Sequence, residues 1–414
     1  MKTLFRFIIL TGILASLTAC PPCEVDEKIC PPDCPPEDTT DYPLEKILEF
    51  RYFTPTTDQN SIGSVGEVKK YKNILIYNGF PPYIDKIFRI FFFDTNTGKR
   101  LKVFKTGYNG LGDMEIIDKY LITSGLDGGF IFDLDNLSLV KKLNNKFYVY
   151  LAQFDNSVYL TALYGPSVQY PDSTSLIKLH IPSLETEKIL TITRKEYGGF
   201  SSLNTVSFEV LENGDTMMYG TYEAQYKKLY SYNLTKGGFV WETRAKGGDF
   251  YSSHPLYDDK YIFITNYLGA EAYDKSTGKL VWRTPLTHDG NWFRGNEPLL
   301  LNGRLYLLAD NKKIFCLDSK DGSIIWENDK AGGGLGGISY YKDMIYHVNE
   351  GNQLIIVDMN TGEELLRIDS PHRNVNPDNV FARFEIMPPY IDSTAGVFYQ
   401  PDRHQIICFK LWEK

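Results

Sequence analysis

The side chains best suited to chemistry in this 414-residue sequence stand in its longer inter-strand segments, and they are of the kinds that bind rather than react. Residues 288–298, HDGNWFRGNEP, form the densest of these segments. Aromatic residues beside proline provide rigid amphipathic contacts of the kind used in protein or glycan recognition. The candidate binding residues are Tyr83, Tyr164, Tyr170, Phe250, His254, Trp292, Arg294, Asn296, Glu297, Arg373, Asn376 and Arg383.

Catalytic and metal-binding patterns are not evident. The chain has only six histidines, and no Ser-His-Asp order, carboxylate pair or histidine-rich metal spacing rises above chance. Residues 331–337, AGGGLGG, contain G-x-G-x-x-G, but a strand rather than a helix is expected to follow, so the glycines are interpreted structurally. The segments beginning at Asp94 and Asp358 resemble calcium loops but lack the sixth-position glycine and the closing glutamate. We therefore predict no catalytic residue and no metal.

A repeated phrase organises the strands that must position these residues. Its clearest copy is Tyr273–Trp282, YDKSTGKLVW, in which the Asp274 carboxylate can accept backbone N–H groups of a turn and Gly278 can adopt positive φ. Alternating Leu280 and Trp282 then give the outgoing strand an apolar face. Further copies of varying quality begin at Asp94, Asp133, His180, Asn233, Asp318 and Asp358, and a degraded one lies at Lys410.

The spacing of the copies indicates the fold class. It averages about 45 residues, the length of one four-stranded propeller blade, and a second apolar run precedes each turn. The last blade lacks an outgoing strand, whereas residues 45–53, EKILEFRYF, offer a spare one that could pair beside residues 406–411 and close the ring. We predict an all-β, eight-bladed β-propeller. Seven blades would result if the His180 region were an insertion, and a sandwich or β-solenoid of hairpins is the alternative.

The phrase D-x-x-T-G-x-x-x-W, seen at Asp274–Trp282, resembles the repeat of the PQQ-like (quinoprotein-type) β-propeller family over about residues 45–414. That family includes quinoprotein alcohol dehydrogenases and a non-enzymatic, BamB-like branch of outer-membrane assembly lipoproteins. The resemblance implies the fold more specifically than the function.

The enzymatic branch of the family holds PQQ beneath a disulfide of adjacent cysteines, with a calcium ion alongside. This sequence has no Cys-Cys dipeptide, and Trp241, Trp282 and Trp326 fall in outer strands where they are expected to pack blade against blade. We accordingly expect no cofactor and assign the chain to the non-enzymatic branch. A PQQ-dependent dehydrogenase is the lesser alternative.

The sequence pattern of the first 44 residues predicts a signal peptide followed by a lipid-anchored tether. Residues 1–19 have the charge and apolar pattern of a signal peptide, and Leu17–Cys20, LTAC, fits a lipobox whose Cys20 would be acylated. Residues 20–44 are rich in proline and acid and too poor in apolar side chains to fold. Pro21 is not the aspartate that retains many lipoproteins in the inner membrane. We predict an outer-membrane lipoprotein facing the periplasm or the cell surface, with the propeller over residues 45–414.

Cysteine usage is consistent with an oxidising exterior. The tether contains Cys23, Cys30 and Cys34, which permit one local disulfide and one remaining thiol, and no nearby histidine completes a metal site. Cys316 and Cys408 stand at near-equivalent strand positions, and we expect them to be buried small hydrophobic residues rather than disulfide partners.

Net charge narrows the choice of partner. The formal charge is −8, and removing Lys2 and Arg6 with the signal lowers it to −10, which disfavours nucleic acid and close contact with anionic lipid. The favoured hypothesis is a non-catalytic scaffold that binds an envelope protein, in one version during outer-membrane protein assembly. The alternative is a glycan-binding or glycan-utilisation surface lipoprotein.

Overall fold

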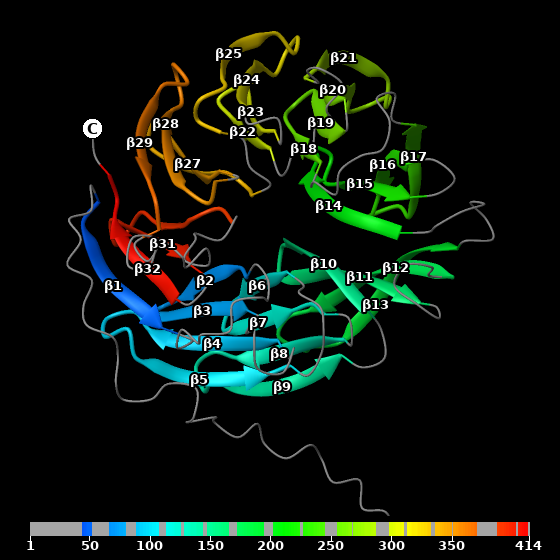
Figure 1. Ribbon diagram of the computed structural model, residues 1–414. Helices are drawn as coiled ribbons and strands as arrows, with labels where there is room; N and C mark the ends of the chain where they lie inside the picture. The colour runs from blue at the N-terminus through cyan, green and yellow to red at the C-terminus, as the bar shows by residue number, and fades with distance from the viewer. Residues whose placement is uncertain are drawn as a thin grey trace, which may run out of the picture.

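The computed structural model describes residues 44–51, 66–79, 88–106, 113–125, 128–143, 147–164, 172–193, 202–223, 227–244, 255–266, 268–286, 298–309, 313–332, 336–349, 351–370, 387–402 and 405–412. These residues form eight antiparallel four-stranded sheets, the blades, arranged in a ring (Figure 1). No helix in these ranges is long and apolar enough to cross a membrane.

The first four blades follow one another along the chain. Blade 1 comprises β2 (Val68–Tyr71), β3 (Ile74–Gly79), β4 (Arg89–Asp94) and β5 (Arg100–Lys105). Blade 2 comprises β6 (Met114–Ile117), β7 (Tyr120–Thr123), β8 (Gly129–Asp133) and β9 (Ser138–Leu143). Blade 3 comprises β10 (Phe147–Phe154), β11 (Ser157–Tyr164), β12 (Ser173–His180) and β13 (Thr186–Thr193). Blade 4 comprises β14 (Ser202–Val210), β15 (Thr216–Glu223), β16 (Lys227–Asn233) and β17 (Gly238–Arg244).

The remaining blades complete the ring. Blade 5 comprises β18 (Leu256–Tyr257), β19 (Tyr261–Asn266), β20 (Gly269–Asp274) and β21 (Leu280–Pro285). Blade 6 comprises β22 (Leu299–Leu301), β23 (Arg304–Leu308), β24 (Ile314–Asp318) and β25 (Ile324–Asn328). Blade 7 comprises β26 (Ser339–Tyr341), β27 (Met344–Val348), β28 (Leu354–Asp358) and β29 (Glu364–Ile368). Blade 8 comprises β30 (Tyr390–Asp392), β31 (Val397–Pro401), β32 (Gln405–Lys410) and β1 (Lys46–Arg51).

The N-terminal strand closes the ring as the sequence predicts. In Figure 1 the blue β1 lies beside the red β32, and the two pair antiparallel, with Leu48 opposite Cys408 and Phe50 opposite Ile406. The backbone N–H of Lys410 also donates to the carbonyl of Glu45 at 2.9 Å. The His180 copy of the repeat forms a regular blade 3, so the number of blades is eight and not seven.

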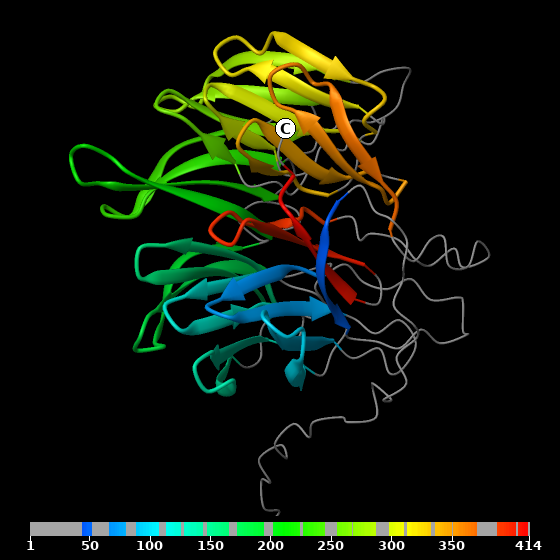
Figure 2. The same cartoon turned by 90° about the vertical axis from the view of Figure 1, so that its left-hand side faces the viewer.

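The four strands of each blade are arranged in order from the centre of the ring to its rim. The first strand of each blade lies innermost, and the fourth, or β1 in blade 8, lies at the rim (Figure 1). The turns that join the first strand to the second and the third strand to the fourth lie at one end of the ring, which we call the turn face. We call the opposite end of the ring the loop face. In the side view of Figure 2 the hairpins of the teal and green blades project to the left.

The hydrophobic core is divided among the interfaces between blades. Eight clusters of buried apolar residues occur, each built from two adjacent blades. The cluster between blades 8 and 1 contains Phe50, Phe91, Phe93 and Ile406. The free thiols of Cys316 and Cys408 are buried in such clusters, and burial raises the pKa of each to about 11. Both cysteines therefore act as small hydrophobic residues, as predicted.

The repeated turns have the predicted chemistry. The Asp274 carboxylate accepts the backbone N–H groups of Ser276 at 3.1 Å and Thr277 at 2.8 Å, and Gly278 has a φ of 66°. Hydrogen bonds from the side chains of Ser276 and Thr277 lower the pKa of Asp274 below its usual value. The segments at Asp94 and Asp358 form the same turn, since each carboxylate accepts two backbone N–H groups of its own turn.

Tryptophans join each of three outer strands to the turn of the next blade. The indole N–H of Trp282 donates to the carbonyl of Ser319 at 3.0 Å, and its ring covers Gly322, where an added Cβ would lie 2.5 Å from the indole. Trp241 makes the same contact with Lys275 and Gly278, and Trp326 with Met359 and Gly362. The turn glycine thus supplies both a positive φ and room for the ring, and the predicted blade-to-blade role of these tryptophans is confirmed.

Candidate binding surfaces

Of the predicted binding residues, Tyr164 alone lies within the described ranges. It ends β11 at the loop face, and its carbonyl accepts the N–H of Asp172 at 2.7 Å. Its ring packs against the core between blades 2 and 3, and the Lys188 ammonium lies 5.4 Å from the ring centroid. Tyr164 is therefore only partly exposed and stabilises blade 3.

The other predicted binding residues lie outside the described residues. They are Tyr83, Tyr170, Phe250, His254, Trp292, Arg294, Asn296, Glu297, Arg373, Asn376 and Arg383, together with the lipidation residue Cys20. They remain predictions. The described residues that adjoin these segments in sequence lie at strand ends on the loop face. Ser370, for example, directly precedes the segment that contains Arg373 and Asn376.

A polar network holds the loop-face end of blade 7. The Asn349 side-chain oxygen accepts the backbone N–H of Gln353 at 2.9 Å, and Arg367 donates to the Gln353 side-chain oxygen at 2.7 Å. The Gln353 amide donates to Asp369 at 3.0 Å. Gly332 approaches so closely that an added Cβ would lie 3.0 Å from the Asn349 amide nitrogen. These contacts hold the chain just before residues 333–335 and just before residues 371–386.

His347 lies beside this network and is fully buried in β27. Ile355 on the neighbouring strand β28 pairs with His347 on one side and with Arg367 of β29 on the other. Burial, with a smaller contribution from the Arg367 guanidinium, lowers the pKa of His347 from 6.5 to about 3. The imidazole is therefore neutral near pH 7 and contributes to packing between blades 6 and 7 rather than to proton transfer with a solvent-exposed ligand.

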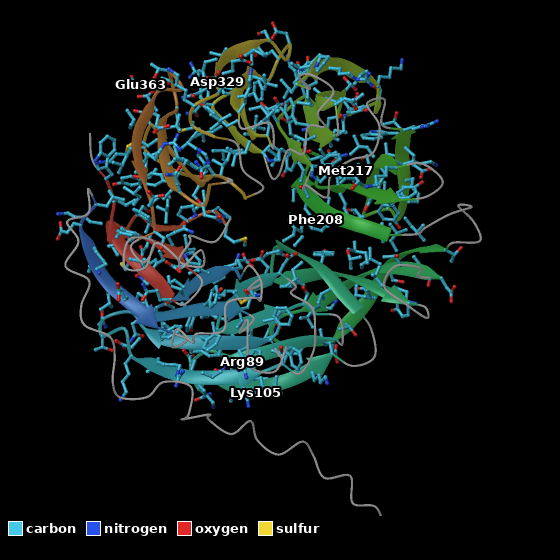
Figure 3. The ribbon with its side chains drawn as sticks, viewed as in Figure 1. Arg89, Lys105, Phe208, Met217, Asp329 and Glu363 are labelled. Atoms are coloured by element: carbon cyan, nitrogen blue, oxygen red, sulfur yellow. The ribbon has the colours of Figure 1, made fainter. Side chains whose placement is uncertain are left out.

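Two charged side chains are fully buried at positions that sequence reasoning missed. Glu271 is fully buried in β20, and its carboxylate lies 2.7 Å from the Arg283 guanidinium and accepts the Tyr273 hydroxyl. Arg89 is fully buried at the start of β4, in register with Lys105 on the outer strand (Figure 3). In sequence, a lone charge among apolar strand residues, as in GAEAYD, is the signal that could have found them.

The rim has a feature that repeats in all eight blades. Each outermost strand contains a one-residue β-bulge at the same register, and the extra residue is always aliphatic: Ile47, Leu101, Val140, Ile189, Val240, Val281, Ile325 and Leu365. Six of these side chains are 42–53% exposed, and Ile189 and Leu365 are half-buried. Because a bulge twists an edge strand away from flat pairing, it limits unwanted association at a sheet edge.

No group of three or more histidine, cysteine, aspartate or glutamate side chains comes together as a metal site within the described ranges. The carboxylates of the repeated turns are instead occupied by the N–H and hydroxyl groups of their own turns.

Taken together, the ring of eight four-stranded blades and the D-x-x-T-G turns define the chain as a PQQ-like β-propeller. A family model described as "Outer membrane protein assembly factor BamB" matches residues 225–383. The family match and the relatives below support a BamB-like form of this propeller.

Curated relatives match the chain over short segments. BamB of Moranella endobia is 33% identical over 90 residues, which cover 20% of this chain and 23% of that protein. BamB of Escherichia coli K12 is 28% identical over 107 residues, 23% of this chain and 27% of that protein. Tetrathionate hydrolase of Acidithiobacillus ferrooxidans is 27% identical over 116 residues, 27% of this chain and 22% of that protein. The chain thus spans about a quarter of the length of these relatives.

Solved structures match over nearly the whole ring. BamB from Moraxella catarrhalis superposes with a TM-score of 0.59 at 11% identity, covering 89% of this chain and all of that one. The computationally designed Ika8 protein superposes with a TM-score of 0.60 at 11% identity, covering 85% of this chain and 98% of that one. At these identities the likeness concerns the fold alone.

Proposed function

We propose that this chain is a non-catalytic scaffold that binds another envelope protein during outer-membrane protein assembly. The observation that carries the proposal is the match of residues 225–383 to a family model described as an outer-membrane protein assembly factor. This segment also contains the three tryptophans that join one blade to the next. A rigid ring presents strand edges and strand ends at fixed positions, and such pre-organisation reduces the entropic cost of binding.

The test is a crosslinking pull-down of the full-length protein from its native membranes. Recovery of β-barrel assembly components above the background of an unrelated lipoprotein is the expected result. Loss of the chain should also lower the abundance of outer-membrane barrel proteins. If neither effect appears, an assembly role is wrong.

We further propose that Cys20 is acylated and that the chain is held at the outer membrane through this lipid, facing the periplasm or the cell surface. The lipobox-like sequence at Leu17–Cys20 supports this. Metabolic labelling with a fatty acid should mark the wild type and not Cys20→Ala, and the variant should leave the membrane fraction. Protease accessibility in intact cells then distinguishes the two faces.

Glycan binding is the competing proposal, and it rests on the aromatic residues of the segments that join strands, Trp292 above all. Retention on immobilised polysaccharide that Trp292→Ala abolishes would favour it over the scaffold. Catalysis is tested directly by assaying dye reduction with added PQQ and calcium, and by assaying tetrathionate hydrolysis because of the hydrolase relative. Turnover in either assay would contradict the non-catalytic proposal.

A further inference from the structure

The eight outer strands differ in how their edges are protected after the bulge. An outer strand pairs with one neighbour only, and natural proteins defend such edges with bulges, prolines and charged side chains. Seven outer strands have at least one charged residue in the part that follows the bulge: Lys102 and Lys105 in β5, Lys141 and Lys142 in β9, Glu242 and Arg244 in β17, Arg283 in β21, Glu327 in β25, Arg367 in β29 and Glu49 in β1.

β13 is the exception. After its bulge at Ile189 it continues with Leu190, Thr191, Ile192 and Thr193, none of which is charged. With eight residues it is also the longest of the outer strands. A run of β-branched and aliphatic residues without charge has a high propensity to pair with another strand. In β13 the charged residues Glu187 and Lys188 both precede the bulge, so the part of the edge after the bulge is the one least protected against pairing among the eight blades.

The position two residues after the bulge shows the contrast most clearly. Six blades place a charged residue there, whereas blade 3 places Thr191, whose hydroxyl is 2.7 Å from that of Ser175 on the neighbouring strand. Blade 1 places the buried Val103 there, but Lys102 and Lys105 flank it. A charge at this position is evidently compatible with the blade, so its absence in β13 is not required by the fold.

We propose that the outer edge of β13, from Ile189 to Thr191, is the docking edge for an extended, uncharged strand of a partner protein. Ile189 and Leu190 are half-buried against the core between blades 3 and 4, so an added strand would extend an existing apolar layer. Only an extended backbone matches the hydrogen-bonding groups of a strand edge, which is the basis of β-augmentation. A charged partner residue opposite these side chains would lose hydration, so an uncharged segment fits best.

This inference rests on the proposed scaffold function, and the test separates the two. A photoreactive amino acid is placed at positions 189, 191 and 193 of the full-length protein in native membranes. If a partner strand pairs with β13, moving the photoreactive residue by two positions along β13 should shift the crosslinked position in the partner by about two residues, because paired strands keep a fixed register. Such a ladder onto another protein is the expected result.

Matched substitutions provide the second readout. Thr191→Lys installs the charge that other blades carry, and it should lower partner recovery in the pull-down at least tenfold. Thr191→Val removes the hydroxyl but keeps the edge uncharged, and Thr243→Lys adds the same charge to β17, so both should bind within twofold of the wild type. Thermal unfolding of each variant establishes that the ring remains folded.

The outcomes are distinct. Full partner recovery by a folded Thr191→Lys variant would overturn docking at β13 and leave the scaffold function standing. A ladder onto β13 of a second copy would also overturn the proposal, because the edge would then serve self-association. Failure of the wild type to recover any envelope protein would instead count against the scaffold function itself.

Discussion

Two arcs of the ring, blades 4 to 7 and blades 8 to 3, use different side chains to join each blade to the next. From blade 4 to blade 7, each outer-strand tryptophan covers a turn glycine of the next blade and donates to a turn carbonyl. From blade 8 to blade 3, the described residues include no such tryptophan. There the ammonium of Lys141 donates to the carbonyl of Leu184 at 2.5 Å, and Leu184, with a φ of 58°, stands where the glycine would be.

Aromatic clusters compensate in the second arc. Phe104 lies 5.7 Å from Phe92 and 4.8 Å from Phe132 between ring centroids, which joins blades 1 and 2 through their cores. The family match covers 225–383, the tryptophan arc, although both arcs form regular blades. The family model therefore matches the part of the ring in which tryptophans join the blades, whereas the propeller fold also forms where other side chains join them.

The largest effect is expected from removing a tryptophan. Trp282 is only 8% exposed, so Trp282→Ala should lose its packing and its hydrogen bond to Ser319 and lower the free energy of unfolding by about 3–5 kcal/mol. Chemical denaturation measures the change. The neighbouring Val281→Ala serves as control and should cost less than about 1 kcal/mol, because Val281 is largely exposed. Equal effects of the two changes would refute the importance of the tryptophan contact.

A smaller effect is expected from filling the space beneath the same ring. Gly322→Ala would place a Cβ 2.5 Å from both the Trp282 indole and the Thr284 hydroxyl, at a φ of 74°. Steric overlap and backbone strain together should cost about 2–4 kcal/mol. Gly214→Ala separates the two causes, because its φ is 82° but nothing lies within 4 Å of the added atom. It should cost about 1 kcal/mol from strain alone, and denaturation midpoints that coincide would show that the ring tolerates the overlap.

Acid should weaken the tryptophan arc at its interface between blades 6 and 7. The pKa of His347 is about 3 in the folded chain and near 6.5 when unfolded, so its stabilising effect is complete above pH 6.5 and is lost as pH falls towards 3. At pH 5 the loss should be about 2 kcal/mol relative to pH 7. His347→Leu should be less sensitive to acid by this amount in urea titrations at the two pH values. An identical pH response of variant and wild type would contradict the argument.

Local chemistry explains how much of the fold was predictable. In the clearest copies of the repeat, an aspartate and a glycine four residues apart specify the turn through contacts within it, so Asp274 and Gly278 could be interpreted without knowing their neighbours. Ring closure by β1 followed from counting strands. The bulges at the rim, the Glu271–Arg283 pair and the burial of His347 depend instead on neighbouring strands and blades, which are remote in sequence.

The candidate site was less predictable than the fold for the same reason. Tyr164 was selected as an exposed aromatic residue, yet its ring also packs against the core between blades 2 and 3. The uncharged edge of β13 was missed because it is defined by a contrast with seven other strands. That contrast becomes visible only when the bulges align Thr191 with residues such as Glu242 and Arg283.

The smallest effect should come from the lysine that takes the tryptophan position in the other arc. Lys141→Met keeps most of the aliphatic stem but removes the donor to the Leu184 carbonyl, and because the side chain is partly exposed the cost should be about 1 kcal/mol. Lys142→Met is the matched control, since the Lys142 ammonium lies over Phe130 of its own blade, and among the described residues it makes no hydrogen bond to another blade. If Lys141→Met were instead as damaging as Trp282→Ala, a single hydrogen bond would hold blades 2 and 3 together. The aromatic and aliphatic clusters of this arc would then contribute far less than their burial indicates.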